Sequence, residues 1–368
     1  MSVASRLFDF SAPAVRTDAV GYTHAKYAQY TRLSQHIYTQ ILQIFDAFEL
    51  PYYLFAGSAL GYVRNGTMLP WIDDLDVILF EEHIPYFEAE VVPFLKACGF
   101  NCFAPRQFQG GGFHILAMQQ GGKRDLTIPF SDGTDVSVPW AQVDVFYTTV
   151  DENGFLRNPR GWGLYDKKDV PADWVAPGVE VELEGWKTRL FSKYEEDILK
   201  EYGDVLNNVV VASHGRVFLN RPNMKWDDFE ADFRAVVAET TAEHPPCCDA
   251  GHLQAFTARP GQLYMSEPRQ SFDAIVAQIL QAGASELHLA EGDQTFWVMD
   301  LKRLFPSLRI RAVFGNEREA YRAVHLRSFI DDVSCEDPDL LAKYEACLAQ
   351  IARLDQGDIG AVGAESVS

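Results

Sequence analysis

The sequence has no apolar run of the roughly 18 to 20 residues that a membrane span needs. It is also short of positive charge, since 32 Lys and Arg stand against 52 Asp and Glu in 368 residues, a formal net charge of −20. General nucleic-acid binders carry a basic face, and so do proteins that bind anionic membrane surfaces. The first twenty residues lack the apolar core of a signal peptide. We therefore expect a cytoplasmic protein that has no membrane span, does not bind nucleic acid and does not have an anionic membrane surface as its main partner.

Two common cofactor motifs are missing as well. The six cysteines form no CxxC pair with a matching second pair, which argues against a structural zinc site. There is no GxGxxG motif, so dinucleotide binding is not supported. The content of 47% hydrophobic and 23% charged residues is ordinary for a globular protein, and the length allows about two domains.

Hydrophobic periodicity predicts a helix over 23–48, which ends before Pro51. Further helices are expected over 84–98 and 188–203, with a strand at 141–149. Beyond a segment rich in Pro, Cys and Gly, alternating helices and strands indicate a small parallel α/β unit. The predicted organisation is an extension at 1–22, a catalytic domain at 23–240, a linker at 241–264, an accessory α/β domain at 265–355 and a disordered tail at 356–368.

One short turn has the composition of a phosphate-binding loop. The apolar run YYLFAGSAL contains Gly57 and Ser58 where a strand is expected to enter a helix. Glycine lets the backbone approach a ligand, and serine can cap the helix or hydrogen-bond an oxygen. The turn therefore predicts a phosphate site at a helix N-terminus, although many strand-to-helix turns share this composition.

Three aspartates lie on apolar strands downstream of this turn. Asp74 and Asp76 stand two apart before VILF, so a strand points both to one side, about 7 Å apart along the backbone. Asp144 lies in the middle of the expected strand 141–149. An aspartate inside an apolar strand is costly unless it is paired or binds a metal. Because oxygen ligands alone suit a hard cation, the predicted cofactor is Mg²⁺ or Mn²⁺, held by Asp74, Asp76 and Asp144. His114, in the short strand FHILAMQ, is interpreted as a satisfied core or edge histidine rather than a catalytic one.

The segment GSALGYVRNGTMLPWIDDLDV resembles the signature of the LicD and fukutin-related family. The family pattern of glycines, an arginine, Pro-Trp and a terminal Asp-x-Asp is matched by Gly57-Ser58, Leu60-Gly61, Arg64, Gly66, Pro70-Trp71 and Asp73 to Asp76. Three further family motifs follow in order, at Val143–Phe146, Leu183–Gly185 and Tyr202–Asp204. The resemblance covers roughly residues 25 to 210.

This resemblance implies an α+β fold, a nucleotidyltransferase-like mixed β-sheet core flanked by helices, to which the small C-terminal βαβ-like unit is added. It implies metal-dependent transfer of phosphocholine or a polyol phosphate from a CDP-activated donor to a hydroxyl of a cell-surface glycan or a lipid-linked sugar precursor, with release of CMP. The implied catalytic residues and metal ligands are Asp74, Asp76 and Asp144, with Asp144 favoured over Asp73 as the base. The implied nucleotide-binding residues are Gly57, Ser58, Arg64, Asp73 and Tyr202.

Two alternatives stay open at this point. The same three carboxylates would support a nucleotidyltransferase that moves NMP to a small molecule or protein and releases pyrophosphate. The fold could also serve as a non-catalytic nucleotide-binding scaffold.

Overall fold

The computed structural model describes residues 25–69, 74–117, 126–129, 135–138, 141–159, 169–213, 216–229, 260–266, 272–289 and 297–359. Asp73, the predicted extension at 1–22, most of the predicted linker and most of the predicted tail lie outside the described residues.

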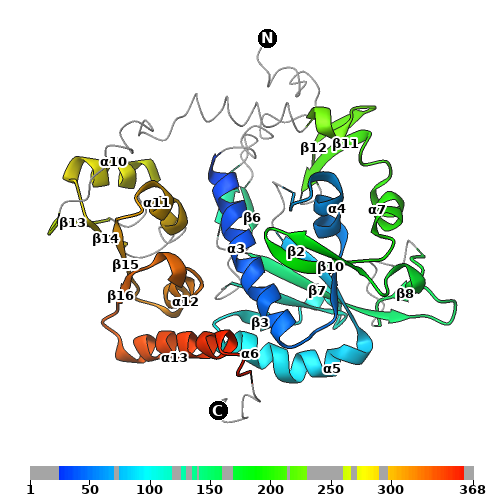
Figure 1. The fold of residues 1–368 in the computed structure, drawn as a ribbon, viewed down its shortest axis with the longest axis horizontal. Coiled ribbons are helices and arrows are strands. Elements are labelled where there is room, and N and C mark those ends of the chain that lie inside the picture. The colour runs from blue at the N-terminus through cyan, green and yellow to red at the C-terminus, as the bar shows by residue number, and fades with distance from the viewer. Residues whose placement is uncertain are drawn as a thin grey trace.

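A mixed β-sheet forms the centre of the N-terminal part of the chain (Figure 1). Its strands lie in the order β1-β2-β7-β4-β3, and β8 pairs with β7 beyond this path. The pair β2–β7 is parallel, whereas the other neighbours are antiparallel. The strands are β1 (Tyr52–Leu54), β2 (Asp74–Phe80), β3 (Asn101–Phe103), β4 (Gly112–Leu116), β7 (Gln142–Val150) and β8 (Leu156–Arg157). The predicted α+β class with a mixed, helix-flanked sheet is confirmed.

The two faces of this sheet differ because side chains alternate along each strand. One set of alternate residues, including Leu75, Val77 and Val143, belongs to a large core that also contains Ile41 and Phe45 of helix α3 (Ala25–Ala47). The helix predicted over 23–48 is therefore present over Ala25–Ala47, and its apolar stripe is buried from Leu33 onward. On the other face, Ile78, Phe146 and their neighbours form a smaller apolar cluster, whose buried members are Phe55, Ile78, Phe108, Phe146, Leu156, Val170, Val175 and Phe191.

The helix predicted over 84–98 is present but is not uniform. It runs from a 3₁₀ turn (Glu81–His83) through α5 (Ile84–Tyr86) and a π-helical turn (Phe87–Val91) to α6 (Val92–Ala97). Pro93 is the second residue of α6. In a regular α-helix its ring would clash with the carbonyl one turn earlier, and it has no N–H to donate. A wider turn before the proline accommodates both effects.

The prediction of a helix over 188–203 is wrong in its first part. Residues 188–190 belong to β10 (Trp186–Leu190), which pairs with β9 (Val179–Leu183), and the helix α7 covers only Tyr194–Tyr202. Glu184 and Gly185 close this hairpin with φ of 53° and 78°, the positive values of a tight turn between strands. Burial alternates along β9 and β10, so the period of two, rather than of 3.6, governs this segment.

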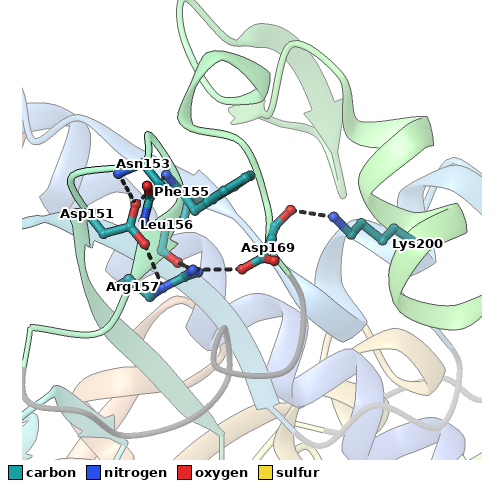
Figure 2. Close-up of polar contacts among 7 residues, drawn as sticks. All are labelled: Asp151, Asn153, Phe155, Leu156, Arg157, Asp169 and Lys200. Carbon is teal, nitrogen blue, oxygen red and sulfur yellow. Dashed lines mark hydrogen bonds and ion pairs between the residues drawn. The ribbon is translucent and has the colours of Figure 1, made fainter.

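A polar network fastens α7 to the hairpin of β7 and β8 (Figure 2). The Arg157 guanidinium lies 3.0 Å from Asp151 Oδ2 and 2.7 Å from Asp169 Oδ1. Lys200 Nζ, on α7, donates to the carbonyl of the same Asp169. The helix that ends at Tyr202 is therefore tied to the sheet edge.

The C-terminal unit is a parallel four-stranded sheet in the order β13-β14-β15-β16, with helices between its strands. Its core includes Ile279, Leu287, Leu301 and Ile310, and the predicted α/β pattern is observed. Its elements are β13 (Leu263–Met265), α10 (Phe272–Ala282), β14 (Glu286–Leu289), α11 (Val298–Leu304), β15 (Arg309–Val313), α12 (Glu317–His325), β16 (Asp332–Ser334) and α13 (Pro338–Asp355).

Helices α12 and α13 also share the large core of the N-terminal part. Ala323, Val324 and Tyr344 belong to the same cluster as Ile37 and Phe100, and Figure 1 shows α13 running beside α6. The exact domain boundaries stay a prediction.

Two further hairpins lie in the described ranges, one of β5 (Leu126–Pro129) and β6 (Asp135–Val138), the other of β11 (Asn208–Ser213) and β12 (Arg216–Pro222). No helix in the described ranges is long and apolar enough to cross a membrane.

Candidate active site

Three carboxylates meet near the amino-terminal ends of β2 and β7. Asp76 and Asp144 are partners across the parallel pair, and Asp74 precedes Asp76 by two residues, so all three side chains share one face. One possible ligand oxygen from each lies within 4.8 Å of the other two. Only 9% of Asp76 and 6% of Asp144 is exposed.

This arrangement fits a divalent cation. Carboxylates held this close repel one another, and partial burial strengthens the repulsion because water screens it less. Oxygen-only ligation of this kind is what Mg²⁺ and Mn²⁺ prefer. The structure therefore brings together the three residues that the sequence predicts as metal ligands.

Ser58 lies behind this site rather than in it. Its side chain is fully buried, and Oγ accepts a hydrogen bond of 2.8 Å from the backbone N–H of Asp76. The Phe55 N–H donates to the Asp76 carbonyl at 3.0 Å, so both sides of the Asp76 backbone are held. A direct contact between Ser58 and a phosphate stays a prediction.

Gly57 lies in the first turn of helix α4 (Ala56–Asn65), as the sequence predicts. The preceding Ala56 has φ of 47°, a left-handed conformation that costs an L-residue roughly 1–2 kcal/mol. Strain of this kind persists only where the surroundings impose it, and it concentrates at binding sites. The positive N-terminal end of α4 lies next to the strand that carries Asp74 and Asp76, because the N–H of Phe55 donates to the Asp76 carbonyl.

The loop that leads from α4 back to β2 packs tightly on the helix. A Cβ at Gly61 would lie 2.8 Å from both the Leu69 nitrogen and the Thr67 carbonyl oxygen. The Met68 N–H donates to Glu184 Oε1 at 2.9 Å, so the hairpin of β9 and β10 holds the loop from the other side. Gly61 has a packing role, since it allows the close approach that sets the start of the carboxylate strand.

Arg64 and Tyr202 lie on neighbouring helices beside the carboxylates. The Arg64 guanidinium carbon is 4.6 Å from the centre of the Trp226 ring, and the side chain is 9% exposed. Desolvation lowers the pKa of Arg64 to about 10, against the opposing influence of Tyr202. The arginine therefore stays positively charged at neutral pH, within electrostatic reach of Tyr202.

The phenol of Tyr202 senses the negative charge of the site. Desolvation, followed by the charges of Asp76, Glu201, Asp197 and Asp74, raises the pKa of Tyr202 above its ordinary value. The hydroxyl is therefore protonated at physiological pH and can donate a hydrogen bond. At the same time 41% of the residue is exposed, so a substrate can reach it.

His114 and Gln142 contact the third carboxylate directly. His114 Nδ1 lies 2.5 Å from Asp144 Oδ1, and Gln142 Nε2 donates to the same oxygen at 2.8 Å. His114 is a satisfied, buried histidine, as predicted from the sequence, but its partner is a member of the carboxylate cluster. The sequence interpretation missed Gln142, although its spacing of two from Asp144 in a strand places it on the same face. No local signal pairs Trp226 with Arg64.

The comparison with known proteins agrees with this geometry. No curated protein matches the chain. Residues 49–190 match the family model described as LicD/FKTN/FKRP, nucleotidyltransferase domain. This segment contains the three carboxylates, Gly57, Gly61 and Arg64, and stops before Tyr202. The chain therefore carries a LicD-family nucleotidyltransferase domain, which spans residues 49–190.

Proposed function

We propose that the protein transfers a phospho-alcohol, phosphocholine or a polyol phosphate, from a CDP-activated donor to a hydroxyl of a glycan or its lipid-linked precursor. The observation that carries this proposal is the carboxylate triad within 4.8 Å, inside the segment that matches the LicD family. Family membership supports phosphotransferase-type glycan modification in general. The donor, the acceptor, the metal and a cytoplasmic site of action belong to the proposal.

The proposed transfer is a displacement at the phosphorus that bears the alcohol. The acceptor oxygen forms a new bond to this phosphorus, and the bond from the phosphorus to the oxygen bridging to CMP breaks. CMP leaves with the electron pair, and the acceptor proton passes to Oδ2 of Asp144, because Oδ1 already accepts from His114 and Gln142. A divalent cation bound by Asp74, Asp76 and Asp144 would neutralise the charge on the phosphoryl oxygens.

Three further groups are proposed to hold the donor. The backbone of Gly57, in the first turn of α4, suits a phosphate because helix N-termini favour anions. Arg64 supplies a positive charge that packing against Trp226 keeps in place. Tyr202, whose hydroxyl stays protonated, can donate to a phosphate or to the base of the nucleotide. Asp73 is proposed to contact the nucleotide as well.

The first experiment measures the release of CMP and of pyrophosphate from a panel of CDP-alcohols and nucleoside triphosphates, with Mg²⁺ or Mn²⁺. We expect metal-dependent CMP release from one CDP-alcohol, abolished in Asp74→Asn and unchanged in Asp173→Asn, a substitution at an exposed position outside the site. Pyrophosphate from a triphosphate would contradict the proposal and support nucleotidyl transfer. Neither product, together with no metal-dependent nucleotide binding, would support a scaffold.

A further inference from the structure

One oxygen of Asp144 is occupied by two donors from different strands. His114 comes from β4, where pairing with β7 places it directly opposite Asp144. Gln142 comes from β7 itself, two residues earlier on the same face. Both approach Oδ1, at 2.5 Å and 2.8 Å. An ionised carboxylate can only accept hydrogen bonds, so the histidine nitrogen that faces it carries a proton.

The histidine is held rigidly. Its ring lies 4.7 Å from the ring of Phe108 and 5.5 Å from that of Phe103, and 6% of the residue is exposed. Phe108 in turn packs against Phe146, part of the apolar cluster that lies farther along the same face of the sheet. The position of the Nδ1 proton is therefore set by packing and strand register, before any ligand arrives.

We infer that His114 and Gln142 are positioning residues whose hydrogen bonds occupy Oδ1 of Asp144, so that only Oδ2 is available to a cation. The site is therefore selective for small cations that prefer octahedral coordination, Mg²⁺ and Mn²⁺, over Ca²⁺. This inference rests on the metal-dependent function proposed above. Two donors on one oxygen oppose rotation of the carboxylate, so that Asp144 binds through a single oxygen. Mg²⁺ and Mn²⁺ accept such ligands in octahedral geometry, whereas Ca²⁺ takes more oxygens and often uses both atoms of a carboxylate.

The hydrogen bonds from His114 and Gln142 form a clamp on Asp144. This clamp also lowers the free-energy cost of holding three negative charges close together. Hydrogen bonds to a carboxylate spread its negative charge onto the donors and hold its orientation. Partners of this kind typically change metal affinity about 10- to 100-fold when they are removed. Removal of the clamp frees the carboxylate to turn, and a turned carboxylate offers both oxygens to a larger ion.

The test is titration of the full-length protein with Mn²⁺ by electron paramagnetic resonance, followed by competition with Ca²⁺. His114→Phe removes the donor and keeps an aromatic ring, whereas His114→Asn keeps an N–H near the position of Nδ1. Gln142→Leu removes the second donor. The matched control is His288→Phe, because His288 Nε2 lies 3.0 Å from Glu286 in the C-terminal sheet, away from β2 and β7 (Figure 1).

We expect His114→Phe to weaken Mn²⁺ binding about 10- to 100-fold and to lower the ratio of Mn²⁺ to Ca²⁺ affinity. Gln142→Leu should shift both quantities in the same direction, whereas His114→Asn and His288→Phe should stay close to wild type. Loss of packing alone would not change the ratio. If His114→Phe does not fold, as judged by circular dichroism, Gln142→Leu decides the question, because it removes the other donor to the same oxygen.

Mn²⁺ binding that stays at the wild-type level with an unchanged ratio in folded His114→Phe and Gln142→Leu would overturn the inference and leave the proposed function standing. Absence of Mn²⁺ binding to the wild-type protein, in the presence of a CDP-alcohol as well as without it, would overturn both.

Discussion

The Ser58 hydroxyl accepts a hydrogen bond of 2.8 Å from the backbone N–H of Asp76, a residue 18 positions later in the chain. The glycine-serine turn and the carboxylate strand are therefore one structural unit. The turn at Gly57 and Ser58, which has the composition of a phosphate-binding loop, also fixes the position of β2 relative to α4. A substitution in the turn acts on the metal ligands through the backbone.

Ser58→Ala should destabilise the protein by about 1–3 kcal/mol, because it leaves the buried N–H of Asp76 without its acceptor. Mn²⁺ affinity should fall as the strand shifts. Urea unfolding and a Mn²⁺ titration measure the two effects. Ser34→Ala is the matched control, since Ser34 is equally buried but its hydroxyl makes no hydrogen bond within the described part of the chain. Equal effects of the two substitutions would argue against the anchoring role.

Removal of one carboxylate charge should abolish metal binding and should stabilise the metal-free protein. Without metal, Asp76→Asn should raise the melting temperature, because it relieves repulsion among groups within 4.8 Å. Mn²⁺ at 100 times its Kd should stabilise the wild-type protein by about 2.7 kcal/mol and leave the variant unaffected. Differential scanning calorimetry with and without Mn²⁺ reads both. A wild-type melting temperature that ignores Mn²⁺ would contradict the metal site.

Gly61→Ala should push the loop of residues 67–69 away from α4, since the added methyl meets backbone atoms at 2.8 Å. The expected loss of stability is about 1–3 kcal/mol, with weaker Mn²⁺ binding. Gly66→Ala offers a comparison, because Gly66 has φ of 65° and open space around its Cβ position. That substitution should cost backbone strain alone. Loss of Mn²⁺ affinity in Gly66→Ala but not in Gly61→Ala would reverse the assignment.

Tyr202 should not ionise in the range where free tyrosine does. Desolvation and the neighbouring carboxylates raise its pKa, so its hydroxyl remains protonated as pH rises through 10. The difference in ultraviolet titration between wild type and Tyr202→Phe, both metal-free, should therefore show no phenolate at pH 10, near the ordinary pKa of tyrosine. Loss of the hydroxyl should raise the KM for the donor about 3- to 10-fold, which corresponds to one hydrogen bond. A phenolate that forms at pH 10 in the difference titration would refute the raised pKa.

His325 should make the fold sensitive to acid. It is fully buried, and burial lowers its pKa from 6.5 to about 3, with Arg327 and His36 adding to the effect against a hydrogen bond to Gly99. The folded protein keeps this histidine neutral while the unfolded chain takes up a proton below pH 6.5. Stability is therefore lost as pH falls from 6.5 towards 3, by at most about 1.4 kcal/mol per pH unit from this residue.

The pH dependence of urea unfolding in His325→Gln checks this prediction. The variant should lose the part of the slope below pH 6.5 that this histidine supplies, whatever its effect on stability at neutral pH. Ser34→Ala, a buried substitution that removes no titratable group, should retain the wild-type slope. Equal slopes in all three proteins would show that His325 is protonated in the folded state.

The carboxylate triad could be predicted from the sequence because its signal is local. Asp74 and Asp76 head a strand, and Asp144 interrupts another, so a period of two and an apolar context suffice. Helix α3 could be predicted for the same reason, since it carries a long apolar stripe at helical spacing. The family motif supplied the order of these elements.

The remaining part of the site depends on register between distant strands. His114 meets Asp144 because β4 pairs with β7 in one antiparallel alignment, and nothing within either strand specifies that alignment. The helix predicted over 188–203 overlaps the last three residues of β10. Glu184 and Gly185, which turn the chain with positive φ, close a hairpin there instead.

The core shared by α3, α6, α12 and α13 bears on the modularity of the chain. Phe100 packs on the His325 ring at 4.4 Å, and the Gln40 amide donates to the His325 carbonyl at 2.9 Å. The C-terminal sheet is therefore coupled to the carboxylate-bearing part by buried apolar and polar contacts. Separating the two would bare Phe100 and the facing side of α3 to water. Recombination that exchanges the C-terminal unit alone would have to supply a matching surface for both, so the two units are constrained to evolve together.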